Sequence, residues 1–236
     1  MLFDLDDTLY VEGDFFRSGF REVARTLAAA GKPGEAESIV RELEAIHFGE
    51  GRDQVFDKLA QRRALPRESV PGLVHLFRIH SPRIRLLSEV PALLARLRGK
   101  GYRLGCVTDG WPDVQRRKVE ALGLAPLLDT VVYTGDYGPR HWKPDPLGFV
   151  ACCARLGVGA GSTVHVGDHP ERDVRGARRA GIVSVRVRDE RGYFSERTGE
   201  GDPPDFEIRA IDELEGVLEA IAGDAPPPAE TRSAVR

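Results

Sequence analysis

Cysteine is scarce in this chain of 236 residues, which contains only three. Cys152 and Cys153 are adjacent and poorly placed to bridge each other, and Cys106 lies alone in an apolar run. No Cys-x-x-Cys pair and no Cys/His spacing typical of a zinc site is present. The cysteine usage therefore argues against structural zinc and indicates a reducing compartment, so we expect a cytoplasmic protein.

Long hydrophobic runs are also missing. No apolar stretch approaches the roughly 20 residues that span a bilayer, and no basic region leads into an apolar stretch near the N-terminus. We therefore expect neither a membrane span nor a secretory signal. The formal net charge of −3 offers no excess of positive charge to nucleic acid or to an anionic membrane.

The length and composition suit a globular protein with one sizeable domain, or one domain and a smaller companion. From residue 89 onward, short apolar strands alternate with helices of about 10 residues, a pattern typical of a parallel sheet with helices on both faces. The expected strands are Met1–Phe3 and the apolar parts of 101–110, 130–135, 162–168 and 182–188, and the expected helices are Val90–Arg98, Pro112–Leu122, Pro146–Leu156 and 172–181.

A helical block interrupts this pattern directly after the first strand. Apolar residues recur at helical spacing within it, as at Phe16, Phe20 and Leu27, and nothing between Val11 and Ser88 resembles a strand. Four helices are expected there: one that carries Phe16 to Leu27 and ends at residues 31–34, and three over Glu35–Phe48, Gln54–Arg63 and Val70–Ile79. We predict an α/β core of residues 1–10 and 89–222, an inserted helical domain of residues 11–88, and a Pro-rich, disordered tail of residues 223–236.

Polar and charged residues follow four of the expected strands. In parallel sheets, ligands collect at the carboxyl ends of the strands, so these residues are expected in one cleft. Several carboxylates, a lysine and a hydroxyl in one cleft suit Mg²⁺ and a phosphoryl group, because Mg²⁺ prefers oxygen ligands and a lysine balances negative charge. The residues are Asp4, Asp6, Thr8, Thr108, Asp109, Gly110, Lys143, Asp168 and Asp173.

Four short stretches carry a family resemblance: "FDLDDT", "VTDG", "WKPDP" and "VGDHPERD". Their order and spacing resemble the four motifs of the haloacid dehalogenase-like superfamily. The resemblance covers the whole chain apart from the tail. It implies a Rossmann-like core, a three-layer sandwich, and a helical cap between the first and second motifs, which is the first class of cap in that family.

The resemblance also implies a role for each carboxylate. Asp4 would be the nucleophile that attacks phosphorus and forms an aspartyl-phosphate. Asp6 would protonate the leaving alcohol and later deprotonate a water molecule. The carboxylates of Asp4 and Asp168 and the backbone carbonyl of Asp6 would hold Mg²⁺, with Asp173 completing the metal site.

The remaining motif residues would bind the phosphoryl group. The resemblance implies that Thr108 donates a hydrogen bond to the phosphoryl oxygens. It also implies that Lys143 neutralises the negative charge of both the phosphoryl group and Asp4. Asp109 stands where relatives often have Asn. We therefore expect its side chain to turn away, so that the backbone at Asp109 and Gly110 binds the substrate. Thr8 is predicted to fix the turn after the first strand by hydrogen bonding.

The presence of Asp6 favours one reaction of the superfamily, the hydrolysis of a phosphate ester. Dehalogenases of the superfamily lack an acid at this position, whereas the alcohol of a phosphate ester needs a proton. The sequence therefore favours a Mg²⁺-dependent phosphatase that acts on a small phosphorylated metabolite, namely a sugar phosphate, a sugar-acid phosphate or a nucleoside monophosphate. We expect a monomer or a homodimer. Two alternatives remain, a phosphosugar mutase and a catalytically silent binding protein on the same fold. Mutase relatives usually have Gly-Val where this chain has Asp7 and Thr8.

Several neighbouring residues have alternative interpretations. Asp173 could instead cap the N-terminus of the helix that follows the fourth motif. His165, inside an apolar strand, is expected to be a core residue with satisfied hydrogen bonds, and His169 is a candidate for contact with substrate or metal-bound water. The loop 134–143, with its Tyr, Arg, His and Trp side chains, is a candidate wall of the substrate pocket.

Overall fold

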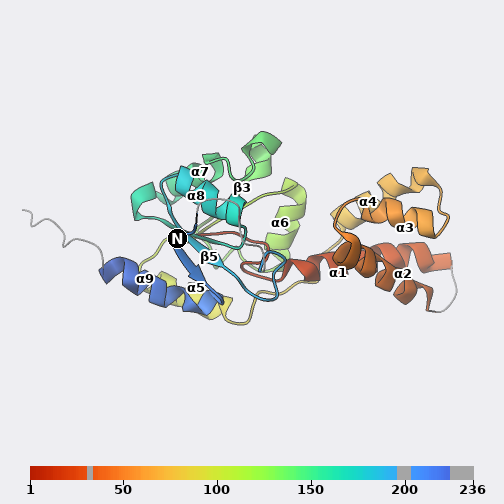
Figure 1. Ribbon diagram of the computed structural model, residues 1–236, viewed down its shortest axis with the longest axis horizontal. Helices are drawn as coiled ribbons and strands as arrows, with labels where there is room; N and C mark the ends of the chain where they lie inside the picture. The colour runs from red at the N-terminus through yellow and green to blue at the C-terminus, as the bar shows by residue number, and fades with distance from the viewer. Residues whose placement is uncertain (31–33, 196–202, 224–236) are drawn as a thin grey trace, which may run out of the picture.

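The computed structural model describes residues 1–30, 34–195 and 203–223, and its centre is a parallel sheet (Figure 1). All pairings between neighbouring strands are parallel, and the strand order is β3-β2-β1-β4-β5-β6. The predicted α/β fold is therefore confirmed. The strands are β1 (Leu2–Phe3), β2 (Gly105–Thr108), β3 (Thr130–Tyr133), β4 (Val164–Gly167), β5 (Val183–Val187) and β6 (Phe206–Ile208).

Helices cover both faces of the sheet because successive strand residues point to opposite sides. Leu2 joins the apolar cluster beneath α7 (Leu147–Leu156) and α8 (Gly176–Arg179), whereas Phe3 joins the cluster of the opposite face. That opposite face is covered by α5 (Val90–Gly99), α6 (Pro112–Ala121) and α9 (Leu214–Gly223).

The regular elements in the part of residues 11–88 that the structure describes are all helical, as predicted, and a non-helical stretch of residues 80–88 leads back to the sheet domain. The helices of this inserted block pack around an apolar cluster of their own, which includes Phe20, Ile39, Leu43 and Leu59. In Figure 1 they extend from one side of the sheet domain. They are α1 (Glu12–Leu27), α2 (Glu35–Glu44), α3 (Val55–Arg62) and α4 (Val70–Ile79).

Two predicted helices have different ends in the structure. The helix expected over Glu35–Phe48 changes at Ala45 into a π-helical turn, Ala45–Glu50, and the helix expected over 172–181 begins earlier, with a π-helical turn over Pro170–Arg175. The tail prediction lies outside the described residues except at Gly223, which ends α9. No helix in the described ranges has the length and apolarity to cross a membrane.

The π-helical turn Ala45–Glu50 buries a histidine among aromatic rings. His47 is 2% exposed, and its ring centroid lies 4.0 Å from that of Phe16 and 5.5 Å from that of Phe20. Neither ring nitrogen has a hydrogen-bond partner among the described residues. Burial, with the positive charges of Arg52 and Arg17, lowers the pKa of His47 from 6.5 to about 4.

His47 is therefore expected to make the fold sensitive to acid. Below its ordinary pKa the unfolded chain binds a proton that the folded chain refuses, so stability is lost as the pH falls from about 6.5 toward about 4. Between about pH 7 and about pH 5 this loss amounts to about 2 kcal/mol. His47→Leu should remove this loss in urea unfolding, whereas the control His75→Leu, at an exposed position of α4, should keep it. An unchanged loss in His47→Leu would contradict this origin.

Candidate active site

The sheet brings the predicted strand-end residues to one edge. Phe3 of β1 pairs with Cys106 of β2 on one side and with Val166 of β4 on the other. The chain therefore leaves these three adjacent strands at the same level, where Asp4 follows β1 and Asp168 follows β4. The strands themselves are almost fully buried, which fixes the starting points of the loops that carry the site.

Three carboxylates form the centre of the site. One oxygen atom from each of Asp4, Asp168 and Asp173 lies within 4.8 Å of the others, and all three residues are buried. The ammonium of Lys143 donates to Asp4 Oδ1 and, at 2.7 Å, to Asp173 Oδ1. The predicted contact between Lys143 and Asp4 is thus present, although the two residues are 139 positions apart in the sequence.

The electrostatics of this cluster fit a divalent cation. Burial raises the pKa of both Asp4 and Asp168 well above the usual value, and the neighbouring carboxylates raise it further, with Lys143 opposing the effect. Burial also acts on Asp173, but Lys143 and His165 outweigh it and hold the pKa of that carboxyl below its usual range. Because a single lysine serves three buried acids, Mg²⁺ bound between their oxygens would stabilise the ionised cluster.

Asp173 is held in place from several sides. Its Oδ1 lies 3.0 Å from Nε2 of His165, and its Oδ2 accepts the backbone N–H of His169 at 3.0 Å. A side chain at Gly167 would collide with it, since a Cβ there would stand 2.4 Å from Asp173 Cγ. His165 is therefore buried as expected but orients a carboxylate of the site, while its Nδ1 has no partner among the described residues.

The N-cap of the segment Pro170–Arg175 is His169 and not Asp173. Nδ1 of His169 accepts the backbone N–H groups of Glu171 and Arg172 at 3.2 and 3.3 Å. The alternative reading of Asp173 as a helix cap is therefore wrong, because its two oxygens are already bonded to Lys143, His165 and the His169 amide. His169 also lines the cavity described below.

Asp6 belongs to a second network, next to the carboxylate trio. Its Oδ1 accepts from the hydroxyl of Tyr10 and, at 2.7 Å, from the ammonium of Lys118, and its Oδ2 accepts from Nε2 of Gln115 at 2.9 Å. Burial opposes ionisation of Asp6, but Lys118 and the other two donors outweigh it and lower the pKa of this carboxyl. Two residues of α6 and Tyr10 of the loop after β1 thus fix the orientation of this carboxyl group.

Sequence reasoning missed Lys118 and Gln115. Lys118 is 4% exposed and also lies over the ring of Phe15, at 4.4 Å from its centroid. It stands four positions before the buried Leu122, on the inward side of α6. The position of this lysine on the apolar face of a short helix was the signal that could have identified it. The sequence did not reveal which carboxylate it binds.

Lys118→Met is expected to lower kcat by about 100-fold, because Asp6 loses its charged partner and with it the orientation needed for proton transfer. The change in KM should be small, since Lys118 is bonded to Asp6 and not to Lys143, the residue predicted to bind the phosphoryl group. Lys100→Met is the matched control, because Lys100 is exposed and pairs with Glu215 on the surface. Steady-state kinetics on the two variants, both checked for folding by circular dichroism, measures the difference; a wild-type kcat in Lys118→Met would exclude this role.

The residues after β2 adopt the predicted arrangement in part. Oδ1 of Asp109 accepts the hydroxyl of Thr134 at 2.7 Å and the backbone N–H of Lys143 at 3.0 Å, so the side chain is turned toward the 134–143 loop. Gly110 has a φ of +126°, a conformation that favours glycine. Thr108 is 1% exposed and its Oγ1 accepts from Gln115 at 2.6 Å, so its hydroxyl lies within the network of Asp6.

The turn after β1 is fixed by Asp7 and not by Thr8. Asp7 has a φ of +52°, and its carboxylate accepts the backbone N–H groups of Glu12 at 2.7 Å and of Tyr193 at 2.9 Å. The hydrogen bond predicted for Thr8 is wrong: this residue is fully buried and its Oγ1 has no partner among the described residues. Asp7 fixes the turn because one of its carboxylate oxygens bonds to the start of α1 and the other bonds to the 189–195 loop.

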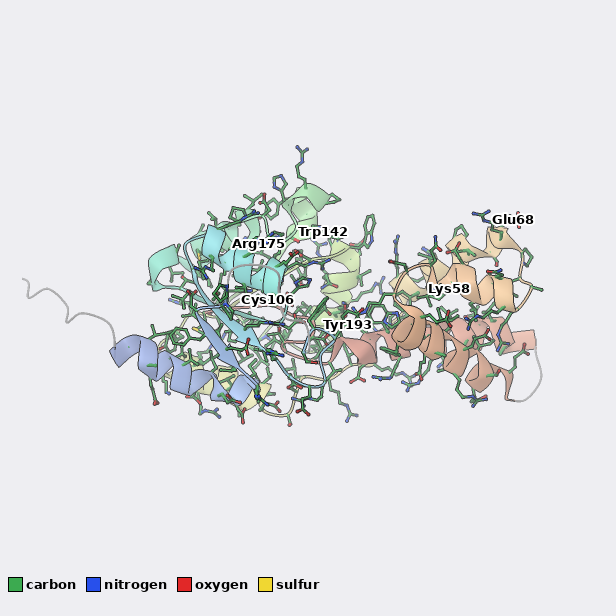
Figure 2. The ribbon with its side chains drawn as sticks, in the orientation of Figure 1. Lys58, Glu68, Cys106, Trp142, Arg175 and Tyr193 are labelled. Carbon is green, nitrogen blue, oxygen red and sulfur yellow. The ribbon has the colours of Figure 1, made fainter. Side chains whose placement is uncertain are left out.

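A cavity of about 360 Å³ connects these groups. The helical insertion contributes Glu12 and Arg52 to it, and the 134–143 loop contributes Trp142 but none of its other side chains that were candidates. Tyr193 lies where the sheet domain meets the helical insertion (Figure 2). The lining residues are Asp4, Asp6, Asp7, Glu12, Arg52, Asp109, Gly110, Trp111, Val114, Gln115, Lys118, Trp142, Lys143, Asp168, His169, Arg172, Asp173, Tyr193 and Phe194.

Carboxylates and a lysine lie at the carboxyl ends of parallel strands, in a cavity that a helical insertion also lines. This arrangement is typical of hydrolases that use a carboxylate and a metal ion. The family description "haloacid dehalogenase-like hydrolase" matches residues 1–181. Glyceraldehyde 3-phosphate phosphatase of Methanopyrus kandleri is 33% identical over 231 residues, covering 95% of this chain and 98% of that protein. Phosphoserine phosphatase of Thermus thermophilus is 31% identical, covering 79% of this chain and 87% of that protein.

Solved structures agree with the fold. The putative haloacid dehalogenase-like hydrolase YfnB of Bacillus subtilis, solved bound to magnesium, superposes with a TM-score of 0.64 at 21% identity, covering 92% of this chain and 96% of that one. The structure of a putative beta-phosphoglucomutase of Thermotoga maritima superposes with a TM-score of 0.65 at 20% identity, covering 93% of this chain and 98% of that one. The chain belongs to the haloacid dehalogenase-like hydrolase family, in its phosphatase branch.

Proposed function

We propose that this enzyme is a Mg²⁺-dependent phosphatase that hydrolyses a small phosphomonoester through a phosphorylated Asp4. The observation that carries the proposal is the cluster of Asp4, Asp168 and Asp173, with oxygens within 4.8 Å of one another and Lys143 bonded to two of the three. Such a cluster can hold a divalent cation beside a nucleophilic carboxylate, which is the arrangement that phosphoryl transfer requires.

In the first half of the proposed reaction, an oxygen of Asp4 attacks phosphorus and the bond from phosphorus to the alcohol oxygen breaks. Asp6, carrying the proton that it took from water in the preceding turnover, gives this proton to the alcohol as it leaves. In the second half, Asp6 takes a proton from a water molecule that attacks the aspartyl-phosphate, which releases inorganic phosphate and restores Asp4. Lys143 balances the negative charge on Asp4 and on the phosphoryl oxygens in both halves.

Mg²⁺ bound by the carboxylates of Asp4 and Asp168 and the carbonyl of Asp6, with Asp173 supporting the site, would spread the charge of the phosphoryl group. The backbone at Asp109 and Gly110, with Thr108, would bind the phosphoryl oxygens. Thr8 lies next to these loops but is fully buried, so its contribution to substrate binding would be indirect.

The proposal assigns residues 1–10 and 89–222 to the catalytic core and residues 11–88 to a helical cap domain. Glu12 and Arg52 of the cap line the same cavity as Asp4, which supports a role of the cap in excluding water during the transfer. The names of the relatives point to small phosphorylated substrates such as glyceraldehyde 3-phosphate or phosphoserine. Sugar phosphates, sugar-acid phosphates and nucleoside monophosphates belong to the same size class.

The test is release of inorganic phosphate from a panel of small phosphomonoesters, with Mg²⁺ and after its removal by a chelator. The proposal expects release that depends on Mg²⁺ and needs no added bisphosphate. A requirement for a bisphosphate, with transfer back to sugar, would establish the mutase alternative. Absence of release from every ester would favour the silent binding protein.

A further inference from the structure

Two arginines of the catalytic cavity, Arg52 and Arg172, have no part in the phosphoryl chemistry proposed above. The two lysines of the cavity are committed to carboxylates: Lys143 to Asp4 and Asp173, and Lys118 to Asp6. The arginines come from opposite parts of the protein, Arg52 from the helical insertion and Arg172 from the segment Pro170–Arg175 of the sheet domain.

Arg172 offers an uncommitted positive charge. It is exposed, and no described carboxylate lies within ion-pair distance of its guanidinium. Its backbone is held by the N-capping bond to His169, and it directly precedes the buried Asp173. The base of this side chain is therefore fixed at the edge of the carboxylate cluster, while its charged end remains available to a ligand.

Arg52 is fixed in orientation but retains free donors. Its Nη1 lies 2.5 Å from Glu12 Oε2, and its guanidinium carbon stands 3.8 Å above the ring of Tyr193. Nε of Arg52 has no hydrogen-bond partner within the described ranges. A guanidinium held by a carboxylate at Nη1 and by an aromatic ring on one face is preorganised, and its positive charge lies in the cavity, where it can attract a carboxylate.

We propose that Arg52 and Arg172 bind a carboxylate on the alcohol portion of the substrate, which makes hydroxy acids phosphorylated on the hydroxyl group the substrate class. The inference rests on the proposed phosphatase function and deepens it. Lys143 and the metal already serve the phosphoryl group, so a second anion must sit on the leaving alcohol. The cavity of about 360 Å³ has room for the phosphoryl group and this carboxylate together.

The test compares three two-carbon phosphomonoesters that differ only in the terminal group: 2-phosphoglycolate (carboxylate), ethyl phosphate (neutral) and O-phosphoethanolamine (ammonium). We expect the wild-type kcat/KM to be highest for the carboxylate, about 10-fold or more above the neutral ester, and lowest for the ammonium. In Arg172→Gln and Arg52→Gln, the ratio of kcat/KM for carboxylate over neutral ester should fall about 10-fold, through KM.

Arg175→Gln is the matched control. Arg175 belongs to the same segment as Arg172 (labelled in Figure 2) but does not line the cavity and lies 3.8 Å from Glu171, so the ratio should stay at its wild-type value. Arg172 is exposed, so its variant tests the inference even where Arg52→Gln disturbs the cap. The inference is overturned by a wild-type ratio near one, or by a ratio that both variants leave unchanged. Hydrolysis of none of the three esters, nor of p-nitrophenyl phosphate, would instead reject the phosphatase function itself.

Discussion

Asp4→Asn is expected to lower phosphatase kcat by ~10⁴-fold or more, because an amide cannot form the covalent intermediate that we propose for the carboxylate. The amide has nearly the same shape, so Lys143 keeps an oxygen acceptor at this position. The substitution also removes one negative charge from a buried cluster in which burial and neighbouring carboxylates disfavour ionisation. The fold should therefore persist while the chemistry is lost.

Steady-state release of inorganic phosphate measures this loss, and urea unfolding checks the fold. The matched control is Asp113→Asn, since Asp113 has a side chain that is 96% exposed at the start of α6 and is remote from the carboxylate trio. Asp113→Asn should have wild-type activity. Full activity in Asp4→Asn would contradict the mechanism outright.

Asp6→Asn is expected to separate the two halves of the reaction. With an alkyl phosphate, both the departure of the alcohol and the attack of water need Asp6, so kcat should fall ~10³-fold or more. With p-nitrophenyl phosphate, the leaving group departs without a proton, and only the second half should be blocked. The variant should then release one nitrophenolate per enzyme in a rapid burst and stall.

Rapid-mixing absorbance measures this burst. Tyr10 and Lys118 both donate to Oδ1 of Asp6, and the amide oxygen of an Asn can still accept from them, so the network loses a charge without leaving a cavity. The control is wild type under the same conditions, which should turn over continuously. Continuous turnover of both esters by Asp6→Asn would show that Asp6 is not the acid and base.

The sequence predicted which residues lie at the carboxyl ends of the strands, because this prediction does not require the order of the strands in the sheet. Every parallel strand ends at the same side, so Asp4 and Lys143 could be assigned to one cleft without knowing which strands are neighbours. Local patterns also predicted helices closely, and α4 spans the expected Val70–Ile79. Strand β6 and helix α9 were not predicted; β6 has only three residues, and one of them is exposed.

The supporting contacts of the site were much harder to predict. Helical periodicity places Lys118 on the inward face of α6, but the partner of Lys118 depends on how the helix packs against the loop after β1. The turn after β1 likewise depended on Asp7, whose carboxylate bonds to Tyr193, 186 residues later in the chain. Such pairings are set by tertiary packing, and local spacing carries no record of them.

The most direct test of the proposed mechanism is the mass of Asp6→Asn after mixing with Mg²⁺ and p-nitrophenyl phosphate. Acid quenching followed by peptide mass spectrometry should find one phosphoryl group on the peptide that contains Asp4. Asp4→Asn treated in the same way should carry none. Release of phosphate without any phosphorylated Asp4, or a phosphoryl group on another residue, would contradict the assignment of Asp4 as the nucleophile.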